Sequence, residues 1–174
     1  MSDILQLIEP LLPALRRYAR ALLRDRTQAD DLVQDTLERA VSHWDQRRTD
    51  RDTRAWLFAI LHNLAMTRLR RAYTTSHLSI DEVAEGAFSS APSQEQGMRY
   101  RELLKALARL PEDQRAVLLL VGVEDLSYAD AARVLDIPLG TVMSRLSRAR
   151  ERLAKEMDSD GLSRQAGSHL RRVK

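Results

Sequence analysis

The chain has 174 residues, a formal net charge of +3 and no cysteine. A chain of this length forms one or two domains, and the absence of cysteine excludes both a disulfide framework and a thiolate metal site. The small positive excess fits a nucleic-acid partner and fits a solvated surface equally well, so the distribution of charge along the chain must decide between them.

The composition predicts a helical protein outside the membrane. No apolar run approaches the roughly 18 residues that span a bilayer, and the opening stretch MSDILQLIEPLLPALRR is acidic and holds two prolines where a signal peptide would be apolar. We therefore expect no membrane insertion and a cytoplasmic location. Glycine and proline are scarce, and charged residues alternate with Leu, Ala and Val at spacings of three and four. This pattern predicts an all-α fold.

The first part of the chain predicts three amphipathic helices that form one small bundle over residues 1–75. Apolar residues recur at helical intervals from Leu11 to Leu23, with arginines on the opposite face. A second helix is expected from about Gln28 to His43, started by Thr27. After the polar stretch WDQRRTDRD, the helical period resumes in TRAWLFAILHNLAMTRLRRAY.

Residues 76–97 are predicted to be a flexible linker. The stretch TTSHLSIDEVAEGAFSSAPSQEQG is rich in Ser, Ala, Gly and Pro, and it contains four acids but no lysine or arginine. Helical periodicity then returns over residues 98–157, where Pro111 suits the first position of a helix. This segment is the second predicted bundle, and residues 158–174 are expected to be a flexible tail.

The second bundle contains the pattern of a helix-turn-helix. Ser127 and Asp130 have the spacing of a capping box, which places the start of a helix there. That helix is predicted to end at Leu135, Asp136 occupies a turn position that tolerates a left-handed backbone, and a second helix begins at about Pro138. In a helix-turn-helix the second helix enters the major groove of DNA.

The outer face of that second helix carries hydroxyl and guanidinium groups at helical spacing. Arginine can bind the O6 and N7 atoms of guanine with two hydrogen bonds, and both groups can bind phosphate. An arginine-rich helix face that is only solvated is the alternative, but the capped helix and proline turn favour DNA. The candidate DNA-binding residues of this helix are Thr141, Ser144, Arg145, Ser147, Arg148 and Arg152.

Three stretches of the chain resemble one known family. LPEDQRAVLLLVGVEDLSYADAARVLDIPLGTVMSRLSRARERL is similar to the C-terminal region of bacterial RNA polymerase sigma factors of the extracytoplasmic-function group, in the sigma-70 family. ADDLVQDTLERAVSHW and TRAWLFAILHNLAMTRLRRA resemble their N-terminal region. The resemblance implies two helical domains joined by a flexible linker. It also implies an alternative sigma factor that binds core RNA polymerase and directs promoter recognition and transcription initiation at a specific regulon.

The resemblance also implies partners and sites. The partners are core RNA polymerase, promoter DNA and an anti-sigma factor, with no cofactor, metal or small-molecule substrate. The second helix of the chain would dock on a coiled coil of the largest polymerase subunit through Asp31, Gln34, Asp35 and Glu38, although an acidic face can also be merely solvated. The minus-ten promoter element would be contacted by Arg47, Arg48, Arg51, Arg54, Asn63, Arg68, Arg70 and Arg71. The helix from about Pro138 would read the minus-thirty-five element.

Several residues leave details open or depart from the family. Trp56 and Phe58 could stack on bases, but Trp56 lies on the apolar face and is expected in the core. Thr67 stands where the family commonly has an acid, and Met143 where it frequently has a basic residue, so the contacts there are expected to differ. The acidic linker would thread channels of the polymerase in the family, and a plain spacer would have the same composition.

Three other functions compete with this hypothesis. A sigma-like mimic that sequesters an anti-sigma factor need not keep DNA-facing arginines, which this chain keeps. A helix-turn-helix regulator acting without core polymerase would need a ligand or dimer domain, and the arginine-rich N-terminal domain does not resemble one. An enzyme is not expected, because the four histidines are scattered and no HExxH pair, phosphate loop or nucleophile motif is present.

Overall fold

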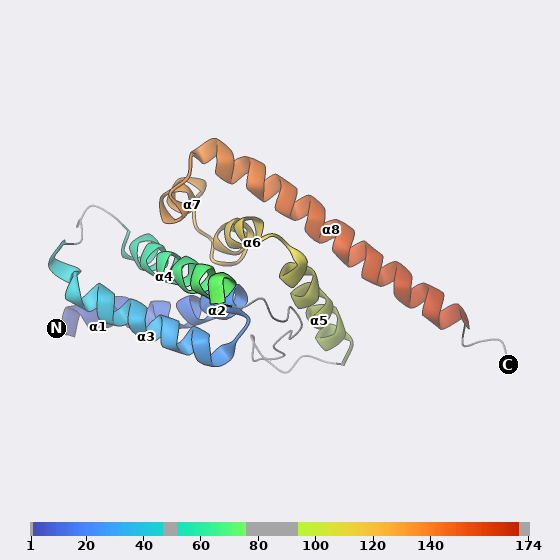
Figure 1. Ribbon diagram of the computed structural model, residues 1–174, viewed down its shortest axis with the longest axis horizontal. Helices are drawn as coiled ribbons and strands as arrows, with labels where there is room; N and C mark the ends of the chain where they lie inside the picture. The colour runs from blue at the N-terminus through green and yellow to red at the C-terminus, as the bar shows by residue number, and fades with distance from the viewer. Residues whose placement is uncertain (1, 47–51, 76–93, 171–174) are drawn as a thin grey trace.

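The computed structural model describes residues 2–46, 52–75 and 94–170, and all regular structure in these ranges is helical (Figure 1). The predicted all-α fold is confirmed. Residues 47–51 and residues 76–93 of the predicted linker lie outside the described ranges, whereas residues 94–97, also predicted as linker, are helical. The helices fall into an N-terminal and a C-terminal group that pack against each other.

The N-terminal group is a bundle built around α2, α3 and α4. Its elements are α1 (Ser2–Ile8), the 3-10 turn η1 (Glu9–Leu11), α2 (Leu12–Leu23), α3 (Arg26–Ser42), the 3-10 turn η2 (Trp44–Gln46) and α4 (Thr53–Thr75). The apolar faces of the three long helices meet in a core that includes Leu15, Leu22, Leu32, Leu57 and Leu61, all at most 2 % exposed. Burying side chains of this size stabilises a fold by roughly 1.5–3 kcal/mol each.

Helix α3 begins at a cap other than the one that the sequence predicted. Arg24 adopts a left-handed backbone with φ 56° and donates its N–H to the carbonyl of Arg20, which ends α2. Asp25 is then extended, and its carboxylate accepts the N–H of Gln28 at 2.9 Å. The predicted cap at Thr27 is therefore wrong. The left-handed Arg24 ends α2, and Asp25, two residues before Thr27, caps α3.

The C-terminal group consists of α5 (Gln94–Arg109), α6 (Glu112–Leu118), the π-helical turn η3 (Leu119–Val123), α7 (Tyr128–Leu135) and α8 (Leu139–Leu170). Figure 1 shows α6 and α7 lying between α4 and α8. Helix α8 continues beyond Asp158, where the sequence predicts a flexible tail to begin. No proline interrupts residues 158–170, so the backbone can stay helical as its end projects past α5 (Figure 1).

A buried arginine joins α5 to α6. The guanidinium of Arg115 donates to the carbonyls of Leu107 at 3.1 Å, Ala108 at 3.2 Å and Leu110 at 2.9 Å. These carbonyls lie at the C-terminal end of α5, where helix carbonyls have no partner in the helix itself. Arg115 is only 8 % exposed, and it therefore fixes the angle between α5 and α6 by satisfying buried acceptors.

The core of the N-terminal bundle holds a tyrosine and a histidine that hydrogen bond to each other. The Tyr18 hydroxyl and the Nδ1 atom of His62 are 3.0 Å apart. Burial raises the pKa of the Tyr18 hydroxyl, so the hydroxyl stays protonated beside Nδ1. Burial also lowers the pKa of His62 to about 4, so its imidazole is neutral near pH 7.

We predict that this histidine makes the protein less stable as the pH falls. Folding lowers the pKa of His62 from 6.5 to about 4, so between these pH values the imidazole is protonated in the unfolded chain and neutral in the folded one. The free energy of unfolding therefore decreases as the pH falls from 6.5 towards 4. The expected loss from His62 is about 2 kcal/mol between pH 7 and pH 5. Urea unfolding of the wild type and of His62→Gln at both pH values measures the difference.

The matched control for this measurement is His43→Gln, because the His43 side chain is exposed at the end of α3. The wild type and the control variant should lose the same stability between the two pH values, and His62→Gln should lose less. An equal loss in all three proteins would show that carboxylates elsewhere account for the whole pH dependence.

Candidate nucleic-acid interface

The first helix of the predicted helix-turn-helix starts at a cap formed by two side chains. The Ser127 hydroxyl accepts the N–H of Asp130 at 3.0 Å and donates to the Asp130 carboxylate at 2.6 Å. The same carboxylate pairs with Arg133 one turn later. The predicted cap is present, with the carboxylate bound to the serine hydroxyl, and a cap of this kind stabilises a helix by about 1 kcal/mol.

The turn between α7 and α8 also has the predicted geometry. Asp136 is left-handed with φ 52° and ψ 50°, and the following N–H of Ile137 bonds to the Ala132 carbonyl at 3.0 Å. Pro138 precedes α8, which begins at Leu139, and its carbonyl accepts the N–H of Thr141 at 3.0 Å. Buried Val134, Val142 and Leu146 hold the two helices together, so the start of α8 has a fixed orientation relative to α7.

The outer face of α8 is divided into exposed and partly covered residues. Ser144, Ser147, Arg148 and Arg152 are exposed, as is the side chain of Met143, whereas Thr141 and Arg145 are partly covered. The Ser144 hydroxyl donates to the Thr141 carbonyl at 3.1 Å and can still accept a hydrogen bond. The exposed set lies within the first four turns of α8, which is the part that a recognition helix presents to base edges.

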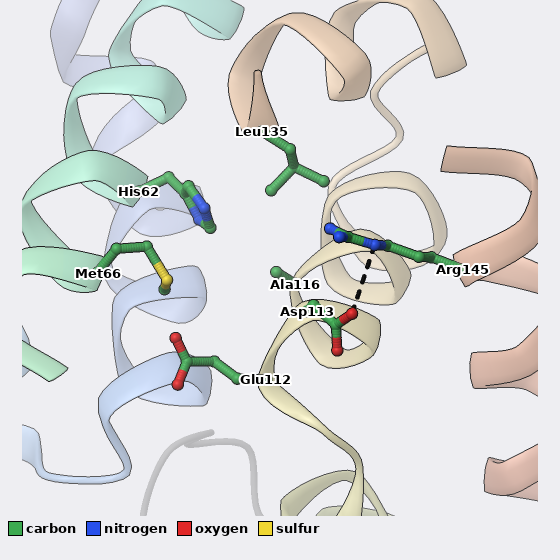
Figure 2. A pocket seen from close by; sticks show the side chains of 7 residues that line it. All are labelled: His62, Met66, Glu112, Asp113, Ala116, Leu135 and Arg145. Atoms are coloured by element: carbon green, nitrogen blue, oxygen red, sulfur yellow. Dashed lines mark ion pairs between the residues drawn. The ribbon is translucent and has the colours of Figure 1, made fainter. Parts of the chain in front are cut away.

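Arg145 lies in a pocket between the two helical groups. The pocket has a volume of about 320 Å³ and is lined by residues of α4, α6, α7 and α8. Figure 2 shows the Arg145 side chain directed into this space opposite His62 and Met66 of α4, with an ion pair to Asp113. The Nε atom of Arg145 is 3.4 Å from the Asp113 carboxylate. The predicted base-reading Arg145 is therefore partly covered in this arrangement, with 31% of its side chain exposed.

The predicted minus-ten residues within the described ranges do not all lie on one exposed face. Arg47, Arg48 and Arg51 lie outside the described residues. Asn63, Arg70 and Arg71 are exposed and share one face of α4. The remaining two, Arg54 and Arg68, both make ion pairs within the protein.

Arg68 and Asp35 connect two surfaces that the sequence assigned to different partners. The Arg68 guanidinium pairs with the Asp35 carboxylate and donates to the Gln28 carbonyl at 3.0 Å. Of the predicted polymerase-binding residues, Asp31, Gln34 and Glu38 stay exposed along α3, with the Gln34 amide 3.2 Å from the Glu38 carboxylate. Asp35 is thus part of the contact between α3 and α4 as well as of the acidic face.

Arg54 binds a buried carboxylate that the sequence did not single out. Glu124, just after η3, has a side chain only 1 % exposed. The Nε and Nη2 atoms of Arg17 in α2 each lie 2.7 Å from one of its carboxylate oxygens, and Arg54 donates to its backbone carbonyl at 2.6 Å. The partners are separated by 107 and 70 positions, so only the fold reveals the cluster.

The two aromatic residues weighed for base stacking are both part of the packing. Phe58 is fully buried and packs edge to face on Tyr18, with ring centroids 5.4 Å apart. Trp56 is partly buried and packs on Trp44 with a centroid distance of 5.9 Å. The predicted core role of Trp56 is consistent with this contact, and Phe58 cannot stack on a base in this arrangement.

The described residues contain neither a membrane-spanning helix nor a metal-binding cluster. None of the helices there combines the length and the apolar character that crossing a membrane requires. Within the same part of the chain, no three His, Asp or Glu side chains lie close enough together to hold a metal ion.

Comparison with protein families gives two matches, one in each helical group. The family model described as "Sigma2 domain of PhyR" matches residues 8–62, which run from the end of α1 into α4. The model described as "Sigma-70, region 4" matches residues 100–153, which contain α6, α7 and the first part of α8.

Comparison with individual proteins extends these matches over most of the chain. The chain is 38% identical over 153 residues to the ECF RNA polymerase sigma factor EcfG of Rhodopseudomonas palustris, covering 86% of this chain and 82% of that protein. It is 37% identical to the ECF sigma factor SigM of Mycobacterium tuberculosis, covering 81% and 70%. The structure of the sigma factor RpoE in complex with the anti-sigma factor NepR from Bartonella quintana matches with a TM-score of 0.79 and 34% identity, covering 92% and 99%.

Proposed function

The chain belongs to the extracytoplasmic-function group of RNA polymerase sigma factors, and from this membership we propose which of its surfaces carries each step of promoter recognition. It is an alternative sigma factor, whose partners are core RNA polymerase, promoter DNA and an anti-sigma factor. Sigma factors are not enzymes, and we propose that this chain likewise has no chemistry of its own and acts in the cytoplasm beside the polymerase.

We propose that the two helical groups divide the promoter between them. Residues 1–75 would bind core polymerase and the minus-ten element, residues 98–157 would bind the minus-thirty-five element, and residues 76–97 would link them. The matches to a Sigma2 domain and to region 4 support this division. Because each domain offers few phosphate contacts, strong promoter binding would require the polymerase to hold both domains on one DNA molecule.

The observation that carries the DNA-binding proposal is the exposed start of α8 directly after the turn at Asp136. In this geometry Ser144, Ser147 and Arg148 would approach base edges in the major groove. Arg152 lies one turn beyond Arg148, about 6 Å along the helix, where it would reach only the phosphate backbone. Met143, exposed on the same face, would offer an apolar contact where relatives commonly place a basic residue.

The minus-ten proposal rests on the exposed face of α4. Asn63, Arg70 and Arg71 share that face, and Thr67 between them donates its hydroxyl to the Asn63 carbonyl at 2.9 Å. Amide and guanidinium groups along one helix face suit a single DNA strand, whose phosphates and base edges are both accessible. Arg68 would contribute by fixing α4 against α3, because its guanidinium is already bound to Asp35 and Gln28.

The first test is reconstitution with purified components. We expect the free protein to bind core polymerase tightly and duplex promoter DNA only weakly, and the reconstituted enzyme to transcribe from a cognate promoter. Run-off transcription and gel shifts at physiological salt measure both properties. Nanomolar, sequence-specific duplex binding by the free protein would instead favour a regulator that acts without polymerase.

We predict that reversing the charge at Asp31 and Glu38 abolishes polymerase binding. Both carboxylates are exposed on α3 and are absent from its buried face, so Asp31→Lys with Glu38→Lys should leave circular dichroism and the unfolding midpoint nearly unchanged. A pull-down with core enzyme should then lose the variant. An unchanged pull-down would show that the acidic face is only solvated.

The matched control is Asp35→Lys, because the Asp35 carboxylate also pairs with Arg68 across the contact between α3 and α4. Its effect should therefore include a loss of stability, of up to about 1 kcal/mol for a pair this exposed. Comparing the variants separates the direct contribution of the acidic face from that of the helix packing.

We predict that the arginines of α8 differ in how they affect promoter strength and base preference. Arg148→Ala should lose about 1–3 kcal/mol on the cognate promoter and relax the preference at one or two base positions. Arg152→Ala should weaken all sequences alike and reduce the salt slope by about one. Arg145→Ala tests whether that side chain leaves Asp113 to contact DNA, in which case its loss also falls on particular bases.

The measurement is transcription from a minus-thirty-five library, scored base by base at two salt concentrations. Arg150→Ala serves as the control, because Arg150 is exposed on a different side of α8 from Arg148. If none of the three arginine variants changed either preference or strength, α8 would not be the recognition helix.

A further inference from the structure

The first turns of α8 carry two large apolar side chains that are exposed to solvent. Leu139 is 45% exposed and Met143 is 49% exposed. They are four positions apart, so they are neighbours on the helix surface and form one apolar pair. The pair follows directly after the turn at Asp136, where α8 begins at the periphery of the molecule (Figure 1). A single exposed apolar residue is ordinary, but two neighbours at the start of a proposed recognition helix point to an apolar contact with a partner.

Gly140 lies beside this apolar pair and has no role in the packing of the protein. Among the described residues, no atom lies within 4 Å of the place that a Cβ on Gly140 would occupy. The residue is in the first turn of α8, where glycine is less favourable than alanine. Close approach of another molecule to the helix backbone accounts for a glycine here, because a side chain would fill the space that the partner needs.

Gly140 is also aligned with the hydroxyl groups proposed to approach DNA. Gly140, Ser144 and Ser147 follow one another at intervals of four and three positions, which places them in one row along the helix. The apolar pair lies on one side of this row and Arg148 on the other, because each residue is rotated by about 100° from the one before. The pair therefore belongs to the same helix face as the candidate hydrogen-bonding groups.

We propose that the apolar pair reads thymine in the major groove by contact with its 5-methyl group, and that Gly140 lets α8 come close to the base edges. Thymine is the base that presents a methyl group in this groove, and apolar side chains recognise it there. The exposed cations Arg148 and Arg152 on the same helix favour DNA over an apolar protein partner, because they can bind the flanking phosphates. This inference deepens the proposed binding of the minus-thirty-five element and rests on it.

Transcription by the reconstituted enzyme from promoters that contain deoxyuridine tests this contact. Deoxyuridine lacks the 5-methyl group of thymine and keeps every hydrogen-bonding atom. We expect the minus-thirty-five library to prefer an A·T pair at one or two positions. Deoxyuridine at those thymines should lower transcription at limiting enzyme by about fourfold for each methyl group lost. A preferred element without such a pair, or equal transcription from both forms of the promoter, would overturn the proposal.

Substitution of the apolar pair identifies the side chains that contact the methyl groups. Met143→Ala should lower transcription from the thymine promoter and should make it insensitive to deoxyuridine at one position, because the contact is already lost. Leu139→Ala should do the same at its own thymine. The matched control is Met98→Ala in α5, because Met98 is also 49% exposed, and it should keep the full response. Equal losses on both forms of the promoter would show that the pair binds a protein, which would overturn the proposal.

Gly140→Ala tests the close approach separately. Because the space beside Gly140 is open within the described chain, the substitution should leave the unfolding midpoint unchanged or raise it, while transcription falls by several times. Unchanged transcription would overturn the close approach. A wild type that responds to the minus-thirty-five sequence but not to deoxyuridine would contradict this inference alone. A wild type whose transcription does not depend on the minus-thirty-five element would contradict the proposed function, and this inference with it.

Discussion

The buried carboxylate of Glu124 is the constraint on which the relative placement of the two domains depends. A charge that is 1 % exposed has lost its water, and it is stable only because Arg17 meets both of its oxygens and Arg54 reaches its backbone. Both arginines come from the N-terminal bundle. This contact joins the two helical groups, with α7 beside α4 and α6 near α2, together with the apolar core that both groups share.

This docking divides α8 into two functional faces. Arg148 and Ser144 are exposed to solvent, whereas Arg145 turns towards the pocket and pairs with Asp113. The three residues lie within five positions, so the direction of each side chain around the helix axis, and not its place along the chain, separates them.

In the N-terminal bundle, an ion pair likewise connects the exposed face of α3 with α4. Asp35 belongs to the acidic face of α3, yet its carboxylate holds Arg68 of α4, and Arg68 also donates to the Gln28 carbonyl of α3. The proposed polymerase surface and the proposed minus-ten surface thus share an ion pair.

The sequence by itself determined the helices, the family and the local geometry of the helix-turn-helix. Ser127 with Asp130 and the left-handed Asp136 were predictable because their partners lie within a few positions, and apolar periodicity located α2 through α4 and α6 through α8. The start of α3 was misplaced, because a left-handed arginine has no strong local signal. Only the tertiary structure decided what Arg54, Arg68 and Arg145 bind, since a cation on an amphipathic helix has the same periodicity whether it faces water, DNA or a carboxylate. Their partners Glu124, Asp35 and Asp113 lie 70, 33 and 32 positions away, and such pairs form only when packing brings distant helix faces together.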